Sequence, residues 1–337
     1  MKTKAAVLRN INGPLIIEEL EIPVLKRGQV LVKILYSGLC HSNINEIRGR
    51  KGANFIPHLT GHEASAIVME VGEGVSKVRE NDYVVCSWVK GSGLEVSSVK
   101  YQSNTDIVNA GACSTFVEYA IVSENRIVKI PREVEPIVAS LLGCAVQVGA
   151  SIIDKSGIKS GQKLAVFGIG GIGASVLIRA ISLGIECYAF DVMSWKLNWV
   201  RKELGVIAVH FDDFNIAHFN DGFDFSVECS GNKAAMETAY ECLKSNGTAI
   251  IAGNLKPGEK ISIDYWGLLT GKTLKGAWGG LSFLDADVPF YALSYIYGSL
   301  PIDKLITKVY PFNEINAGLE DLESGRLVRG VIKILGD

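Results

Sequence analysis

Cys40 stands in the run "SGLCHSNINEIRG", where thiol, imidazole, hydroxyl and amide groups follow one another within a few residues. His62 and Glu63 follow in "LTGHEASAIV", and Cys144 lies in "LLGCAVQVG". Two thiolates and one imidazole form a Cys₂His set, which suits zinc with one coordination position left open. The intervals between the three residues are long, so spacing alone does not distinguish this set from three unrelated side chains.

Each member of the set also has a simpler interpretation. Cys144 fits a small apolar residue of a hydrophobic core, because the segment around it has helical apolar spacing that predicts a helix. His62 lies where the chain turns before a strand and would serve equally as a turn residue. Cys40 would serve as a buried, unreactive thiol. These residues alone leave both interpretations open, a metal site or three unrelated structural residues.

A second group of residues predicts a nucleotide site. "FGIGGIG" places Gly168, Gly170 and Gly173 in G-x-G-x-x-G spacing, after an expected strand and at the start of an expected helix. These glycines would allow, in turn, a tight turn, approach of a pyrophosphate and close packing of helix on strand. Gly171 and Ile172 belong to the same first turn, whose free N–H groups favour phosphate.

Asp191 ends the next expected strand and would bind the ribose hydroxyls of NAD(H). A 2′-phosphate would meet this carboxylate, so NAD(H) is preferred over NADP(H). Lys196 lies five residues further on, within reach of the same ribose, although a solvated helix lysine explains it nearly as well. A Rossmann unit that binds no nucleotide is the alternative to the whole site.

The elements that must position these residues divide the chain in two. Short Val- and Ile-rich runs in the first third, separated by turn residues, predict antiparallel strands in a barrel-like unit. From residue 162 onward, strands alternate with helical segments, which is typical of a doubly wound parallel sheet. At 337 residues, two domains are expected.

Composition excludes several classes of protein. With 34 basic and 36 acidic residues and no basic stripe, neither nucleic acid nor an anionic membrane is an expected partner. The first residues do not form a signal peptide, and no run approaches the roughly 18 apolar residues of a membrane span. Seven cysteines without framework spacing indicate reduced thiols, and hence a cytoplasmic protein.

Over nearly its whole length the chain resembles the zinc-dependent medium-chain alcohol dehydrogenases. The runs that carry the resemblance are "GLCHSNI", "LTGHEASAIVMEVGEGV", "NDYVVCSW", "STFVEYAIV", "LLGCAVQVG", "FGIGGIG", "FDFSVECSG", "LLTGKTLKGAWGG" and "ESGRLVRGVI". It implies a GroES-like β-rich catalytic domain over residues 1–145 and 279–337, and a Rossmann domain over 146–278. It also implies a homodimer or homotetramer.

The resemblance assigns roles to individual residues. Cys40, His62 and Cys144 would hold one catalytic zinc ion, with Glu63 beside the metal as an alternate ligand. Ser42 would receive the substrate proton. The remaining implied residues are Arg329 at the cofactor pyrophosphate, and Trp88, Phe116 and Asn254 around the substrate and nicotinamide.

The chain departs from the family pattern at several positions. Residues 89–109, where many relatives hold a structural zinc with four cysteines, contain no cysteine, so no structural zinc is expected. Asn43 replaces an aspartate that orients the histidine ligand, and an amide supports that imidazole less. Asn45 replaces the relay histidine of alcohol-oxidising members. His41 stands where arginine commonly approaches the pyrophosphate, although a surface histidine fits as well.

These features predict reversible hydride transfer between NAD(H) and an alcohol or its aldehyde or ketone. Two alternatives stay open. A zinc-free quinone or enone reductase of the same superfamily would lack the Cys₂His set, and metal analysis distinguishes it. A non-catalytic dinucleotide-binding protein would bind NADH without turning over any alcohol.

Overall fold

The computed structural model describes residues 1–219, 222–256 and 258–335, and the chain forms two compact units. The first unit comprises residues 1–147, 283–298 and 306–337, and the second comprises 148–282 and 299–305. The predicted ranges 1–145, 279–337 and 146–278 differ from these units at their borders and at residues 299–305. As an assignment of domain functions they stay a prediction.

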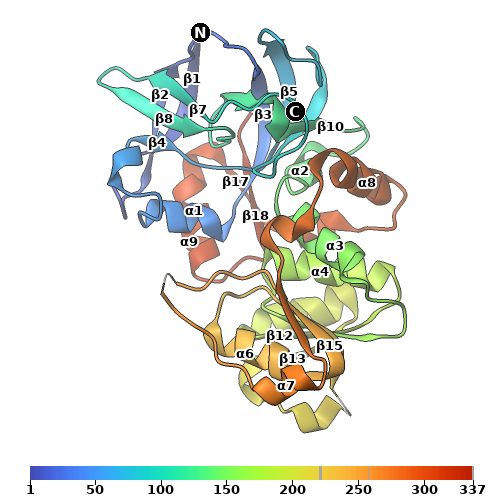
Figure 1. Cartoon of the computed structure of the whole chain (residues 1–337). Coiled ribbons are helices and arrows are strands. Elements are labelled where there is room, and N and C mark those ends of the chain that lie inside the picture. Colours follow the sequence, from blue (N-terminus) through green and yellow to red (C-terminus); the bar gives the residue numbers. More distant parts are fainter. Residues whose placement is uncertain (220–221, 257, 336–337) are drawn as a thin grey trace. The chain divides into compact units, whose positions relative to one another are not determined.

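The first unit is built on a closed barrel and an adjoining sheet (Figure 1). The barrel strands, in spatial order, are β1 (Lys2–Leu8), β2 (Leu15–Glu21), β7 (Ser98–Gln102), β8 (Ile107–Gly111) and β4 (His58–Leu59). The sheet runs β10 (Ile127–Lys129), β6 (Tyr83–Cys86), β5 (Ala64–Val71), β3 (Gln29–Gly38), β18 (Arg329–Lys333) and β17 (Ile306–Pro311), and β9 (Tyr119–Ser123) also pairs with β3.

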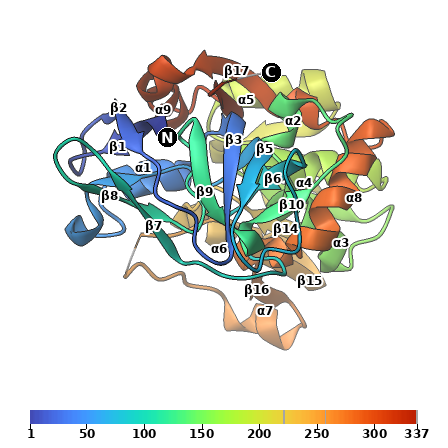
Figure 2. The same ribbon diagram turned by 90° about the horizontal axis from the view of Figure 1, so that it is seen from above.

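Strand β3 lies at the centre of this sheet, between β5, β9 and β18. Figure 2 shows it beside β5 and β9. Its sequence QVLVKILYSG is almost wholly buried, which explains the continuous run of branched aliphatic residues. Strand β7 instead alternates exposed and buried residues, as a strand with one wet face does. The helices of this unit are α1 (His41–Ile47), α2 (Pro136–Ala139), α8 (Leu284–Ile296) and α9 (Ile315–Glu323).

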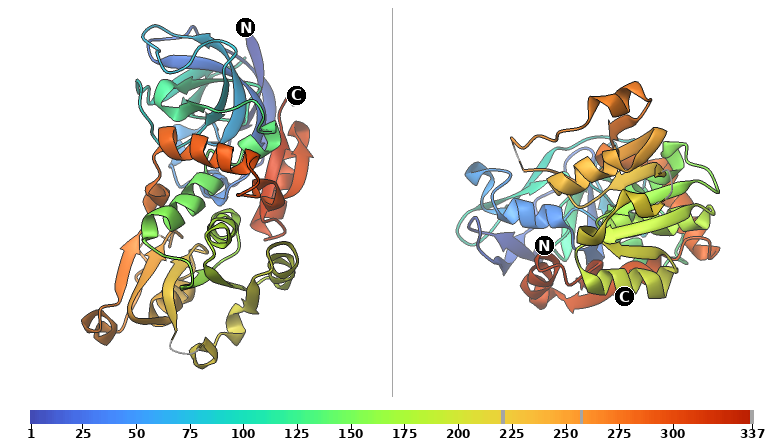
Figure 3. Two further views of the ribbon diagram at one scale, coloured as in Figure 1. Left: turned by 90° about the vertical axis from the view of Figure 1, so that its right-hand side faces the viewer. Right: turned by 90° about the horizontal axis from the view of Figure 1, so that it is seen from below.

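The second unit is a sheet whose neighbouring strands are all parallel (Figure 3). Its order is β13 (Ile207–His210), β12 (Glu186–Asp191), β11 (Lys163–Phe167), β14 (Phe223–Glu228), β15 (Leu243–Ile251) and β16 (Thr273–Gly276). The order reverses direction at β11, which is the doubly wound arrangement predicted from the sequence.

Helices lie before and between the parallel strands. They are α3 (Ala145–Ser156), within which the border of the two units falls, α4 (Gly171–Ser182), α5 (Ser194–Trp199), α6 (Lys233–Glu241) and α7 (Tyr265–Leu269). Helix α5 continues as a π-helical turn, Val200–Leu204, and ends at Gly205 in a left-handed conformation. Short 3₁₀ segments are Ala53–Phe55, Glu124–Arg126, Phe211–Asp213, Ile216–Phe219, Trp278–Leu281, Ile302–Leu305 and Phe312–Glu314.

Candidate functional site

Cys40 lies between the central strand β3 and helix α1, for which it is the N-cap residue. Its backbone N–H donates to the Oδ1 atom of Asn43 at 3.0 Å. The other side of the same amide, Nδ2, lies 3.4 Å from Nδ1 of His62. Asn43 is fully buried, so this one amide fixes the position of Cys40 relative to His62.

His62 and Glu63 lie in the connection between β4 and β5, as the sequence predicted. The Ser42 hydroxyl oxygen, on the first turn of α1, is 3.5 Å from both ring nitrogens of His62. Segments that are about twenty residues apart in sequence therefore bring a hydroxyl against the imidazole.

Cys144 does not lie on a helix, contrary to the expectation from the apolar spacing around it. Residues 140–144 form turns between α2 and α3. The reason is a close approach: a side-chain carbon on Gly143 would lie 2.1 Å from the carbonyl oxygen of Cys86. The turn lets the Gly143 backbone lie against β6, and Cys144 follows it directly, before α3 begins.

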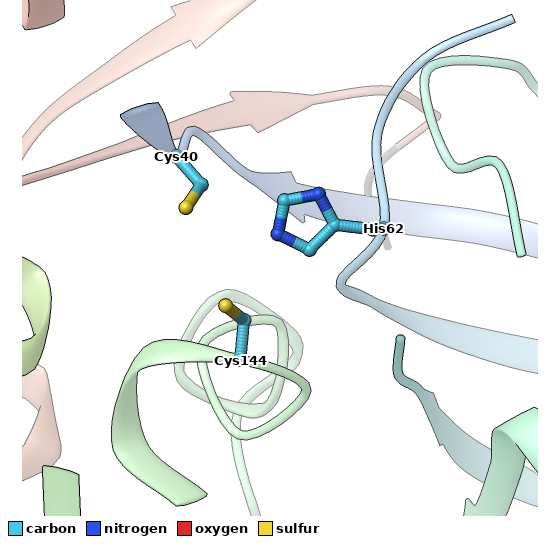
Figure 4. A group of neighbouring side chains, drawn as sticks. All are labelled: Cys40, His62 and Cys144. Carbon is cyan, nitrogen blue, oxygen red and sulfur yellow. The ribbon is translucent and has the colours of Figure 1, made fainter. Parts of the chain in front are cut away.

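The three predicted donors converge. Both sulfurs and a ring nitrogen, of Cys40, Cys144 and His62, all lie within 4.8 Å of one another. Figure 4 shows the two sulfurs and the imidazole turned toward the same space. Three segments that are distant in sequence thus supply three soft or borderline donor atoms to one point.

The pKa values of this cluster shift in different directions. A hydrogen bond from the Cys144 thiol, followed by the influence of His62, holds the pKa of Cys40 well below its usual value. Burial opposes a charged imidazole, but the neighbouring Cys40 outweighs it and raises the pKa of His62 to about 9. The hydrogen bond to Cys40, together with burial, raises the pKa of Cys144. The lowered pKa of Cys40 favours its thiolate, and this sulfur in turn raises the pKa of His62.

Glu63 and Arg329 form a buried ion pair beside this cluster. Their side chains are 0% and 4% exposed, and the Arg329 Nη2 group donates to Glu63 Oε1. Burial raises the pKa of Glu63, although the Arg329 charge opposes the shift. The second oxygen, Oε2, has no hydrogen-bond partner among the described residues. This free oxygen agrees with the expectation that Glu63 serves as an alternate ligand, which stays a prediction, as does the role of Arg329 at a pyrophosphate.

A further cluster next to α1 was not singled out from the sequence. Glu46 pairs with Lys51 at 2.7 Å, and its second oxygen is 3.9 Å from Nε2 of His58. His58 is buried, and desolvation followed by the nearby Lys51 charge lowers its pKa. The sequence did contain a signal for Glu46: it follows Ser42 by four residues, which places the two side chains on one face of a helix.

The glycine loop has the geometry that the motif predicts. Gly168 follows β11 with φ of +87°, and a side chain there would collide with Ser230. A side-chain carbon on Gly173 would lie 2.0 Å from the Gly168 carbonyl oxygen, so α4 packs directly on the loop. Around Gly170, in contrast, no atom lies within 4 Å of where a side chain would start. That open position and the Gly171–Ile172 start of α4 are free for a phosphate group.

Asp191 ends β12, next to this loop. Its carboxylate accepts the backbone N–H of Ile169 at 2.6 Å and that of Met193 at 2.8 Å. The acid is therefore held in place by main-chain donors on both sides. Lys196, on α5, is only 7% exposed, which argues against a solvated lysine, and burial lowers its pKa despite the Asp191 charge.

The remaining predicted residues lie in different surroundings. Asn254 lines a depression at the end of β15 together with Met236 and Leu255. Phe116 is fully buried in the barrel core, and Trp88 is half-buried after β6 and accepts a hydrogen bond from Arg126 through its carbonyl. The expected roles of Asn254, Phe116 and Trp88 in a substrate pocket stay predictions. On α1, His41 and Asn45 are both exposed.

Residues 89–97, the part of the cysteine-free segment without regular structure, are held by carboxylates. Glu124, 1% exposed, accepts backbone N–H groups of Ser76 at 2.7 Å, Lys77 at 2.9 Å and Leu94 at 2.6 Å. Asp285 accepts the N–H of Ser92 at 2.6 Å. Hydrogen bonds from the main chain to the buried Glu124 and the exposed Asp285 thus organise this segment.

Known proteins are similar to this chain in sequence and in structure. A family model described as alcohol dehydrogenase GroES-like domain matches residues 26–132, and one described as zinc-binding dehydrogenase matches residues 171–292. The S-(hydroxymethyl)glutathione dehydrogenase of Komagataella pastoris is 30% identical over 98% of this chain and 97% of its own. The chain belongs to the zinc-dependent medium-chain alcohol dehydrogenase family. It is therefore an oxidoreductase of the alcohol dehydrogenase type.

Further members of the family are similar in sequence and structure. The class-3 alcohol dehydrogenase of Cereibacter sphaeroides is 28% identical over 98% of this chain and all of its own. The benzyl alcohol dehydrogenase of Acinetobacter calcoaceticus superimposes with a TM-score of 0.90 at 25% identity over 99% of both chains. An alcohol dehydrogenase zinc-binding domain protein of Burkholderia ambifaria reaches 0.93 at 25% identity, also over 99% of both. In the described part of this family member, no helix has the length and apolar character needed to cross a membrane.

Proposed function

We propose that this family member uses one zinc ion to catalyse reversible hydride transfer between a small alcohol, or the corresponding aldehyde or ketone, and NAD(H). The observation that carries the proposal is the convergence of the Cys40, His62 and Cys144 donor atoms within 4.8 Å. A homodimer or homotetramer in the cytoplasm is part of the same proposal.

The donor set fits zinc in chemistry as well as in position. Cys40 has a thiol whose pKa is held low, and a thiolate is the form that binds metal. Cys144 and His62 supply a second sulfur and an imidazole nitrogen, which makes three protein ligands and leaves one position for substrate or water. The chemistry that zinc supplies when bound is Lewis acidity toward the alcohol oxygen, which favours loss of the hydroxyl proton.

Side chains around this set have separate tasks. Ser42, 3.5 Å from His62, would take the proton of the alcohol. Asn43 would hold Cys40 and His62 in register through its two amide atoms. Glu63 brings an unpartnered carboxylate oxygen, whose charge Arg329 balances.

In the second unit, the Gly168–Gly173 loop and the start of α4 would bind the pyrophosphate, and Asp191 would bind the adenosine ribose. Its carboxylate supports NAD(H) over NADP(H), because its negative charge would repel a 2′-phosphate. Backbone N–H groups hold both of its oxygens in place. Lys196, buried near the same carboxylate, would contact the ribose from α5.

The test is a zinc assay on the purified protein, paired with a screen of alcohols with NAD⁺ and of aldehydes and ketones with NADH. We expect about one zinc per chain, turnover in the screen and lower activity with NADP⁺. Turnover of quinones or enones by zinc-free protein would instead identify the reductase alternative. NADH binding without turnover of any compound would identify a non-catalytic dinucleotide-binding protein.

A further inference from the structure

Asn45 cannot carry the substrate proton from the site to solvent, because it is an exposed amide that does not titrate near neutral pH. Another group must therefore take this step. A hydroxyl such as Ser42 can accept the substrate proton only if it passes its own proton onward. An acceptor within one helical turn of Ser42, with contact to solvent, would complete the path.

Glu46 meets these requirements. It lies four residues after Ser42 on α1 (Figure 1), so the two side chains share a helix face, with their Cβ atoms about 5–6 Å apart. A water molecule between the two side chains would connect the hydroxyl to the carboxylate through hydrogen bonds. The negative charge of Glu46 also contributes, after burial, Cys40 and Glu63, to the pKa of His62.

The surroundings of Glu46 connect that face to the solvent. The Glu46 side chain is 16% exposed, and its partner Lys51 is 44% exposed. The buried His58 lies 3.9 Å away, and the charge of Glu46 also contributes to the pKa of His62. The carboxylate is therefore partly open to water and lies on the same helix as Ser42.

We propose that Glu46 receives the proton from Ser42 during alcohol oxidation and delivers it to water, which completes a relay that Asn45 cannot serve. The inference rests on the proposed function. The alcohol loses a hydride to NAD⁺ and a proton to Ser42, and Ser42 gives its own hydroxyl proton to Glu46. Glu46 then releases that proton to solvent and returns to the carboxylate, so the products are a carbonyl compound, NADH and one H⁺.

The test compares Glu46→Gln and Glu46→Asp with the wild-type enzyme in single-turnover alcohol oxidation. NADH formation is followed by absorbance and proton release by a pH indicator. In weakly buffered solution at pH 7, we expect NADH formation in Glu46→Gln to fall about 10-fold or more, with proton release delayed. Adding imidazole as an external proton acceptor should restore most of the rate, and Glu46→Asp should retain it.

Glu323→Gln is the matched control, because Glu323 pairs with Arg48 immediately after α1 and lies outside the relay. It should have the wild-type rate with or without imidazole, and all variants should bind zinc and NADH as the wild type does. A wild-type rate in Glu46→Gln would overturn the relay, as would a loss that neither imidazole nor Glu46→Asp restores, since that pattern indicates a structural role. A wild-type enzyme without zinc or without alcohol turnover would instead refute the proposed function.

Discussion

Two regions of the first unit hold polar groups in opposite ways. One is the set Cys40, His62 and Cys144; the other is residues 89–97 with their acceptor Glu124, which we call the Glu124 segment. In the first, three side chains from separate segments face one another, and Cys40 and His62 each shift the pKa of the other toward its charged form despite their burial. In the second, the acceptor is one carboxylate and the donors are backbone N–H groups. The first arrangement offers lone pairs to a cation, whereas the second uses its lone pairs internally.

This difference explains why a cysteine-free segment 89–97 is compatible with an ordered structure. Glu124 joins residues 76–77 to Leu94, and Ser123 bonds to Leu94 and Val96. Charge-assisted hydrogen bonds to backbone N–H groups are strong when buried. We therefore expect the two regions to respond independently to substitution.

The largest expected effect is that of Cys40→Ala. The loss of one sulfur leaves two ligands, so bound zinc should disappear and turnover should fall about 1,000-fold or more, since Lewis-acid stabilisation is worth several kcal/mol. Zinc content, steady-state kinetics and NADH titration measure the outcome. NADH binding should be unchanged, and full activity in this variant would remove Cys40 from the mechanism.

The second effect is a steep pH dependence of zinc uptake. Near neutral pH the metal-free cluster holds one proton on Cys144 and one on His62, whose pKa is about 9, while the pKa of Cys40 is held well below its usual value. Zinc must displace both protons, so its apparent affinity should rise about 100-fold per pH unit between pH 7 and 8. Competition with a chelator measures the affinity. An affinity that does not change over this range would contradict the assigned protonation.

The third effect is on the Glu124 segment. Glu124→Gln replaces one acceptor oxygen by an NH₂ group that faces backbone donors, which should lower the free energy of unfolding by about 2 kcal/mol. Urea denaturation measures it, with Glu95→Gln on the exposed surface as the control. Zinc content should stay at the wild-type level. A loss of zinc would show that the two regions are coupled.

The stabilities of the wild type and of Glu124→Gln should also respond differently to acid. Burial works to raise the pKa of Glu124, but hydrogen bonds from the Leu94, Ser76 and Lys77 N–H groups hold it below its ordinary value of 4.5. Because the folded-state pKa is the lower one, this stabilisation is present above pH about 4.5 and is lost as pH falls through the folded pKa. The stability difference between wild type and Glu124→Gln should therefore shrink in acid.

The smallest effect is expected for Ser123→Ala. Ser123 Oγ donates to the Leu94 carbonyl at 3.0 Å and accepts the Val96 N–H at 2.7 Å, so its removal should cost about 1 kcal/mol. Ser97→Ala, at an exposed position, should have no measurable effect on urea denaturation. Equal losses in both variants would show that these side-chain hydrogen bonds do not hold the segment.

The sequence by itself determined the doubly wound sheet and the glycine loop, because both depend on neighbours in the chain. A strand, a G-x-G-x-x-G turn and a helix are adjacent, and their steric requirements at Gly168 and Gly173 are local. It also predicted the family, through motifs spread over most of the chain. The ends of the helices were predicted less well. Apolar spacing placed Cys144 on a helix, because periodicity carries no information on the backbone contact of Gly143 with Cys86.

Only the tertiary structure decided which distant groups meet. The approach of Cys40, His62 and Cys144, the pairing of Glu63 with Arg329, and the position of Glu46 beside His58 all join residues from different elements. The bonds from residues 76–77 and 94 to Glu124 are of the same kind. Residue types indicate what a side chain can bind, but burial and partners arise only when the strands and turns pack, and these in turn set the charge of each group.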